Sequence, residues 1–327
     1  METLVGEFLA ARGVRKPSVH TLQAYRRDLT SILDLVADGR DVAALPLADL
    51  SPRALRSAFA RFAAARAPAS VYRAWSSWNS FFTFLVTDGF VAGNPMSAVD
   101  KPRVAAPAPK PLRGEDTPER LLAAVGSAAV SGRDQGRQRD PWPERDVVVL
   151  ALALCAGLRL SELLALRTGS FVGRAGERRV EVAGKGGRPR TVPIEPELDA
   201  VVRAYLVTRG QRARTRSDVL LLDRRGEPLR RGGLQYLVQS CYRRAGITDR
   251  VPRGAQLHAL RHTFATRLAE DGANAGEIMR LLGHASLTTS QNYIEVTAAQ
   301  QRAAVRANRT HRALGALLRG DGELRRP

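Results

Sequence analysis

The spacing of apolar residues predicts helices over most of the first 100 residues. In segment 18–36 the apolar positions recur at intervals of three and four: Leu22, Tyr25, Leu29, Ile32 and Val36. A later segment repeats this spacing with Trp75, Trp78, Phe82 and Leu85. Such a series lies along one side of a helix and needs a partner surface. The pattern therefore predicts a small helical bundle over residues 1–100.

The pattern changes after residue 100. Four prolines in segment 101–113 predict an extended linker. The ten-residue apolar run 147–156 predicts a buried helix, and the polar segment 131–146 before it predicts a loop. Alternating residues on both sides of "GKGG" (184–187) predict a β-hairpin: Val180, Val182, Val192 and Ile194.

These patterns predict a mostly helical, α+β fold with a small antiparallel sheet. We expect a helical domain at 1–100, a linker at 101–113, and a second domain at 114–327. Segment 297–318 has a helix-forming composition and predicts a tail helix at the end of that second domain.

Charge narrows the choice of partner. The chain has 51 basic and 32 acidic residues, a net charge of +19. The first 100 residues hold 11 and 9 of these, so 40 and 23 fall in the remainder. Such an excess suits a polyanion, meaning nucleic acid or an anionic membrane surface. The longest apolar run is too short to span a bilayer, and the acidic N-terminal segment lacks a signal-peptide layout. We expect a cytoplasmic protein that binds nucleic acid.

The segment "LHALRHTFAT" (257–266) holds the densest candidate chemistry. Two of the five histidines in the chain, His258 and His262, flank Arg261 here, and a helix places all three on one side. Histidines at this spacing can bind zinc, but Ala259 stands where the metalloprotease motif has glutamate and Arg261 would repel a cation. The two cysteines of the chain also provide no zinc site. Two readings stay open: hydrogen-bonded structural histidines, or a phosphate site in which arginine is the bidentate donor.

Three more segments, taken with this one, resemble the tyrosine site-specific recombinases of the Xer and phage-integrase group. They are "CAGLRLSELLAL" (155–166), "GKGGRPRTVPI" (184–194) and "LLGHASLTTSQNYIEV" (281–296). The N-terminal "SVHTLQAYRRDL" (18–29) also resembles the SAM-like core-binding domain of that group. The resemblance implies these catalytic residues: Arg159, Lys185, His258, Arg261, His284 and the nucleophile Tyr293. It implies supporting roles for Glu162 and His262, and Ser161 is expected to cap the helix after Arg159.

The resemblance further implies a mechanism. Tyr293 attacks a DNA phosphate, which makes a 3′-phosphotyrosyl link, and His258 is the expected acceptor of its proton. The two arginines stabilise the added negative charge, Lys185 protonates the leaving 5′ oxygen, and His284 hydrogen-bonds the phosphate. No metal, ATP or other cofactor is expected.

The resemblance also implies partners. The two domains would form a C-shaped clamp on double-stranded DNA with paired half-sites, and a homo- or hetero-tetramer would act on two sites near the nucleoid. An accessory DNA translocase or excisionase is possible for this group. Ile294-Glu295 replaces the Thr-His of Xer proteins, which leaves an Xer recombinase and a phage or mobile-element integrase both open. Two other classes compete: a DNA-binding protein without strand exchange, and a type IB topoisomerase-like enzyme.

Overall fold

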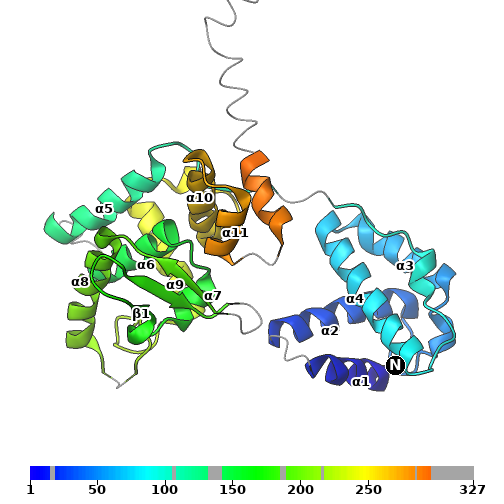
Figure 1. Cartoon of the computed structure of the whole chain (residues 1–327). Coiled ribbons are helices and arrows are strands. Elements are labelled where there is room, and N and C mark those ends of the chain that lie inside the picture. Colours follow the sequence, from blue (N-terminus) through cyan, green and yellow to red (C-terminus); the bar gives the residue numbers. More distant parts are fainter. Residues whose placement is uncertain are drawn as a thin grey trace, which may run out of the picture. The chain divides into compact units, whose positions relative to one another are not determined.

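The computed structural model describes residues 1–14, 19–104, 108–131, 142–184, 189–214, 217–283 and 286–295. Contacts between residues divide the chain into two units, Met1–Ala106 and Pro107–Pro327. Figure 1 draws both units. Within the described part of the chain, none of the helices combines the length and the apolar character needed to cross a membrane.

The first unit is the predicted helical bundle. Its elements are α1 (Glu2–Gly13), α2 (Val19–Ala37), η1 (Leu47–Asp49), α3 (Pro52–Ala64), α4 (Pro68–Thr87) and η2 (Pro95–Ala98). The predicted apolar stripes face inward, since Leu29 and Ile32 of α2 and Trp78 and Phe82 of α4 are buried together.

The second unit contains the described helices that follow residue 106. They are α5 (Thr117–Ser131), α6 (Pro143–Cys155), α7 (Leu160–Ala165), η3 (Thr168–Ser170), α8 (Pro196–Arg212), α9 (Arg231–Arg244), η5 (Thr248–Arg250), α10 (Gln256–Glu270) and α11 (Ala275–Leu282). Residues 287–295 are also helical. These elements and the sheet surround the core of this unit.

Helix α6 starts earlier than the sequence pattern suggested. The expected loop 131–146 is wrong at its C-terminal end, because α6 begins at Pro143. Proline is favoured at a first helical position, where its missing N–H needs no partner. Glu144 and Asp146 in the first turn also suit the positive end of the helix dipole. Residues 132–141 of the expected loop lie outside the described part.

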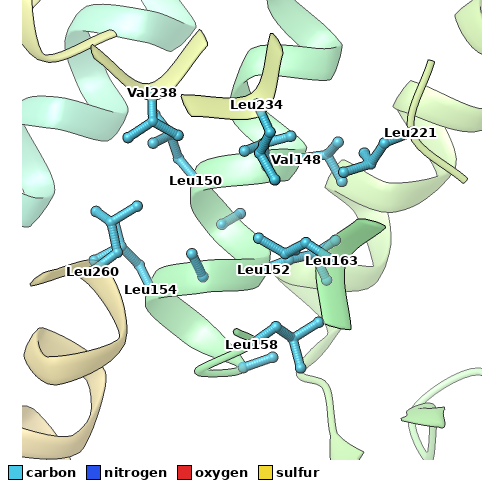
Figure 2. Close-up of a cluster of buried hydrophobic side chains, with 14 of the residues drawn as sticks. Val148, Leu150, Leu152, Leu154, Leu158, Leu163, Leu221, Leu234, Val238 and Leu260 are labelled. Carbon is cyan, nitrogen blue, oxygen red and sulfur yellow. The ribbon is translucent and has the colours of Figure 1, made fainter. Parts of the chain in front are cut away.

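Helix α6 forms the centre of the second unit. It packs against α5, α8, α9 and α10, and the side chains from Val148 to Ala153 are buried. Figure 2 shows Leu150 beside Val238 of α9, and Leu154 beside Leu260 of α10. A helix surrounded on all sides needs no polar face, which explains the unbroken apolar run. Residue 260 therefore anchors α10 to a rigid core.

A small antiparallel sheet lies beside these helices. Its strands are β1 (Phe171–Val172), β2 (Arg179–Val182) and β3 (Arg190–Pro193), in the order β1-β2-β3. The predicted hairpin is confirmed, with Val180 opposite Val192 and Val182 opposite Arg190. Strand β1 was not predicted, since two residues are too few to show an alternating pattern. Residues 185–188, which include Lys185, lie outside the described part.

Candidate active site

Helix α10 places His258, Arg261 and His262 at the site. Leu257 and Leu260 hold one side of the helix in the main core. Arg261 is only 5% exposed, because other segments of the unit cover it. His258 is exposed and His262 is half-buried. The helix therefore presents one buried cation between two imidazoles.

The Arg261 guanidinium connects segments that are distant in sequence. It donates to the carbonyl oxygens of Gly157, at 2.5 Å, and Leu282, at 2.6 Å. Burial and the nearby Arg159 together lower the pKa of Arg261 to about 9, although Glu162 acts to raise it. Arg261 therefore keeps its charge at neutral pH.

Arg159 is held at the start of α7. Its backbone N–H donates to Oε2 of Glu162 at 2.7 Å, and its guanidinium donates to Oε1 at 2.6 Å. A second guanidinium nitrogen donates to the Gly283 carbonyl at 3.1 Å. The expected cap at Ser161 is wrong, because α7 begins at Leu160 with Arg159 as the N-cap. The Glu162 side chain caps the helix instead, because its carboxylate accepts the hydrogen bond from the backbone N–H of Arg159, as the third-position glutamate of a capping box does.

Glu162 is the common partner of three arginines. Its side chain is 4% exposed and accepts two hydrogen bonds from Arg190, at 2.7 and 2.9 Å. Arg261 approaches it to 3.7 Å. Burial raises the pKa of Glu162, but the bonds from Arg190 and Arg159 outweigh burial and lower this pKa to about 2. Glu162 is therefore ionised across the physiological range and orients the cations around it.

The inferences from sequence missed Arg190. Besides Glu162, this side chain donates from Nε to the Leu281 carbonyl at 2.9 Å. A signal was present, because Arg190 alternates with Val192 and Ile194 on the core-facing side of β3. An arginine on such a face implies a buried acidic partner. Arg190 thus links the hairpin, α7 and the end of α11.

Tyr293 lies within this arrangement. It is 4% exposed and packs with Ala265, Ile278 and Leu282. Its hydroxyl oxygen is 2.6 Å from Nδ1 of His262. Burial raises the pKa of Tyr293, although Arg261 and Arg159 act to lower it. The phenol is therefore protonated at neutral pH.

The structure thus gathers six of the eight residues that the sequence singled out: Arg159, Glu162, His258, Arg261, His262 and Tyr293. Lys185 and His284 lie outside the described residues. In the part of the chain that the structure describes, there is no group of three or more His, Cys, Asp or Glu residues that could hold a metal ion. What is assembled is a cluster of fixed cations beside a phenol, which suits a phosphate rather than a cation.

Comparison with known proteins identifies the family. The model of the phage integrase family matches residues 120–300, and the model of the phage integrase N-terminal SAM-like domain matches residues 7–89. The chain belongs to the phage integrase family. This recombinase is 30% identical over 301 residues to tyrosine recombinase XerD of Listeria innocua serovar 6a, covering 91% of this chain and 95% of that protein. It is 36% identical over 302 residues to tyrosine recombinase XerC of Mycobacterium bovis strain BCG / Pasteur 1173P2, covering 91% and 94%.

Solved structures share the fold of this recombinase. The XerH site-specific recombinase bound to palindromic difH substrate, in a post-cleavage complex, matches with a TM-score of 0.72 at 18% identity, covering 90% of this chain and 82% of that one. A lambda integrase dimer bound to a COC′ core site matches with a TM-score of 0.65 at 17% identity, covering 90% and 77%. The predicted fold, mostly helical with a small antiparallel sheet, is confirmed. With the sequence relatives, it makes the protein a tyrosine recombinase that carries out site-specific DNA recombination.

Proposed function

We propose that this recombinase cuts DNA by attack of Tyr293 on the scissile phosphorus, which leaves a 3′-phosphotyrosyl link and a free 5′-hydroxyl. One observation carries the proposal: the Tyr293 side chain packs against Leu282, whose carbonyl oxygen accepts a hydrogen bond from the Arg261 guanidinium. Guanidinium groups bind phosphate oxygens in a bidentate way and stabilise the charge that develops during displacement. The covalent link conserves the bond energy, so rejoining needs no ATP.

The other site residues complete this assignment. Lys185 protonates the departing 5′ oxygen, and His284 hydrogen-bonds the phosphate. The resemblance implied that His258 is the proton acceptor, but because its side chain is exposed we assign it a hydrogen bond to the phosphate instead. Arg261 donates to the carbonyl of Leu282, and Arg159 donates to the carbonyl of Gly283. These are the two residues before His284. Glu162 supports the site by holding the arginines in place.

The proposed substrate is double-stranded DNA with paired half-sites. Residues 1–100 form a core-binding domain and residues 114–327 a catalytic domain, joined by the linker 101–113, and the two close as a clamp on DNA. The net charge of +19 supports this, as do the related structures, which were solved with DNA sites. Four protomers, of one or two kinds, act on two sites in the cytoplasm, at the nucleoid. An accessory translocase or excisionase controls them.

The test uses a covalent trap. A binding site is first selected from a random duplex library, and then a nick is placed so that cleaved DNA cannot religate. The native protein is expected to form a 3′-linked adduct that survives denaturation. Tyr293→Phe is expected to bind the same DNA with unchanged affinity and form none, because only the attacking oxygen is lost.

Tyr236→Phe is the matched control, because Tyr236 is an exposed tyrosine of α9. This variant should form the adduct at the native rate. A 3′ adduct with Tyr293→Phe would show that another residue is the nucleophile and would overturn the assignment.

A further inference from the structure

The Tyr293 hydroxyl lies within hydrogen-bond distance of His262. Nδ1 of His262 and the hydroxyl oxygen are 2.6 Å apart, and the ring centroids are 5.8 Å apart. We propose that His262 is a further catalytic residue, which takes the proton of Tyr293 during cleavage and returns it during rejoining. This inference rests on the proposed nucleophilic role of Tyr293.

Tyr293 needs such an acceptor. Burial raises its pKa above the ordinary value of 10.0, and the opposing effect of Arg261 and Arg159 does not reverse the shift. A protonated phenol is a poor nucleophile, so its proton must move as the oxygen attacks. The acceptor must lie within hydrogen-bond reach of that oxygen, and His262 does.

His262 is in the right protonation state to accept. Burial, together with His258, Arg261 and Lys110, lowers the pKa of His262 to about 4. The ring is therefore neutral at physiological pH. With its hydrogen on Nε2, it has a free lone pair on Nδ1 for the hydroxyl of Tyr293.

The surrounding charges also couple proton transfer to DNA binding. Among the described residues, the positive or titratable groups that face His262 include His258 and Arg261 on its own helix, Lys110 on the segment before α5, and the Tyr293 hydroxyl. A phosphate bound by Arg261 adds negative charge beside the ring, which raises the pKa of His262. The imidazole thus becomes a stronger base when the substrate phosphate is in place.

His258 has a different setting. It lies one turn earlier on α10, is exposed, and has its ring centroid 6.4 Å from that of His262. The sequence resemblance implied that His258 takes the proton, whereas the 2.6 Å contact favours His262. An exposed imidazole suits a hydrogen bond to a DNA phosphate oxygen, which is the role proposed for His258 above.

The step is balanced without any further reactant. The O–H bond of Tyr293 breaks and its proton moves to Nδ1 of His262, while the phenolate oxygen forms a bond to phosphorus. The bond from phosphorus to the 5′ oxygen breaks, and that oxygen takes a proton from the group proposed as Lys185. Rejoining reverses each transfer, so the proton on His262 returns to the departing phenolate.

The experiment measures how the rate of cleavage depends on the removal of the proton from Tyr293. Single-turnover cleavage is measured from pH 6 to pH 10 on the trapped duplex described above, with sulfur replacing the bridging 5′ oxygen. A thiolate leaves without a proton, so the leaving-group acid no longer limits the rate. His262→Asn places an amide oxygen near the Nδ1 position, which keeps a hydrogen-bond acceptor but cannot carry a proton at these pH values. His258→Asn is the matched comparison on the same helix.

The expected result is a change in the pH profile. The native rate should be nearly flat from pH 7 to pH 9. At pH 7 His262→Asn should be slower by about 100-fold or more, in the range of general-base effects. Its rate should then rise about tenfold per pH unit, because the phenolate must form by loss of its proton to solvent. The defect of His258→Asn should stay constant with pH.

Other outcomes overturn the inference. A defect of His262→Asn that is the same at every pH would show a purely positioning role, and a rising profile for His258→Asn alone would make His258 the base. If His262→Asn does not fold, cleavage by the native protein in D2O gives a second measurement. Proton transfer from Tyr293 in the rate-limiting step should make cleavage of the sulfur-containing substrate slower in D2O than in H2O. An unchanged rate in D2O would contradict the transfer. Failure of the proposed function is distinguishable, because Tyr293→Phe would then still form the adduct.

Discussion

Among single residues, Glu162 determines how the cations of the site are arranged. It is buried and hydrogen-bonded to Arg159 and Arg190, with Arg261 at 3.7 Å. Removing one partner of such a buried group leaves uncompensated charge, which costs about 3–5 kcal/mol. Glu162→Gln should therefore lower the free energy of unfolding by about that amount at pH 7, measured by urea denaturation.

The acid dependence of stability provides a check on the role of Glu162. Its pKa falls from 4.5 to about 2 on folding, so its contribution is fully present above pH 4.5 and is lost as the pH falls toward 2. The native protein should lose stability in this range, whereas Glu162→Gln should lack that part of the loss. The gap between the two proteins should therefore narrow below pH 4.5. A gap that stays constant down to pH 3 would contradict the ion-pair explanation.

Arg190 is a positioning residue, because it acts on the site through Glu162 and the Leu281 carbonyl. Lysine keeps the charge but loses the planar, bidentate geometry. Each charge-assisted hydrogen bond is worth about 1.5–3 kcal/mol, so Arg190→Lys should slow single-turnover cleavage by about 10- to 100-fold. Half-site affinity, measured by gel shift, should stay within about threefold of native, a difference below 1 kcal/mol.

Arg179→Lys is the control for this prediction, since Arg179 is an exposed arginine of the neighbouring strand β2. Cleavage by this variant should match the native rate. Equal rates for Arg190→Lys and the native protein would show that the geometry of Arg190 does not matter for catalysis.

Among the elements, the junction between β3 and the end of α11 controls how the Tyr293 segment leaves the core. Gly283 ends α11 with φ of +61°, and a Cβ there would lie 2.9 Å from Cδ of Arg190. Gly246, after α9, has a similar φ of +63° with open space around it. Alanine at either position should cost about 1–2 kcal/mol of stability through left-handed strain.

Only Gly283→Ala should also reduce cleavage, because its new methyl group displaces Arg190 from Glu162. Thermal unfolding and single-turnover cleavage of the two variants measure both effects. If the two variants cleave DNA equally well, the close approach of Gly283 and Arg190 has no catalytic role.

For the whole molecule, the segment after Tyr293 bears on assembly. Residues 296–327 lie outside the described part of the chain, and segment 297–318 has a helix-forming composition with modest apolar surface. We predict that it docks on a neighbouring protomer and couples assembly to activity. Truncation after Ala303 should leave binding to one half-site nearly unchanged. Cooperative binding to a full site, and recombination, should fall sharply.

Gel-shift titrations on half and full sites measure this difference. Truncation after Arg319 is the control, because it keeps segment 297–318 and removes only the final residues; it should bind and recombine like the native protein. An equal loss of affinity on half and full sites after truncation at Ala303 would instead mean that the tail stabilises its own domain.

Much of the fold follows from local sequence patterns. The apolar stripes of α2 and α4 and the hairpin of β2 and β3 were predicted, because each depends on residues only a few positions apart. The predicted site residues came from motifs read in order along the chain. The wrong start of α6 and the wrong cap of α7 show the limit of this reasoning, since several nearby residues can begin a helix equally well.

Contacts between distant residues were decided only by tertiary structure. Arg190 reaches Glu162 across 28 residues and Leu281 across 91, and no periodicity connects such positions. Likewise, the resemblance implied that His258 takes the proton of Tyr293, whereas His262 is the residue whose Nδ1 lies within hydrogen-bond distance of its hydroxyl. That depends on how α10 and the helical segment 287–295 pack, which sets the 2.6 Å contact with His262. The sequence determined which chemical groups the site contains, and side-chain packing decided which of them share a proton.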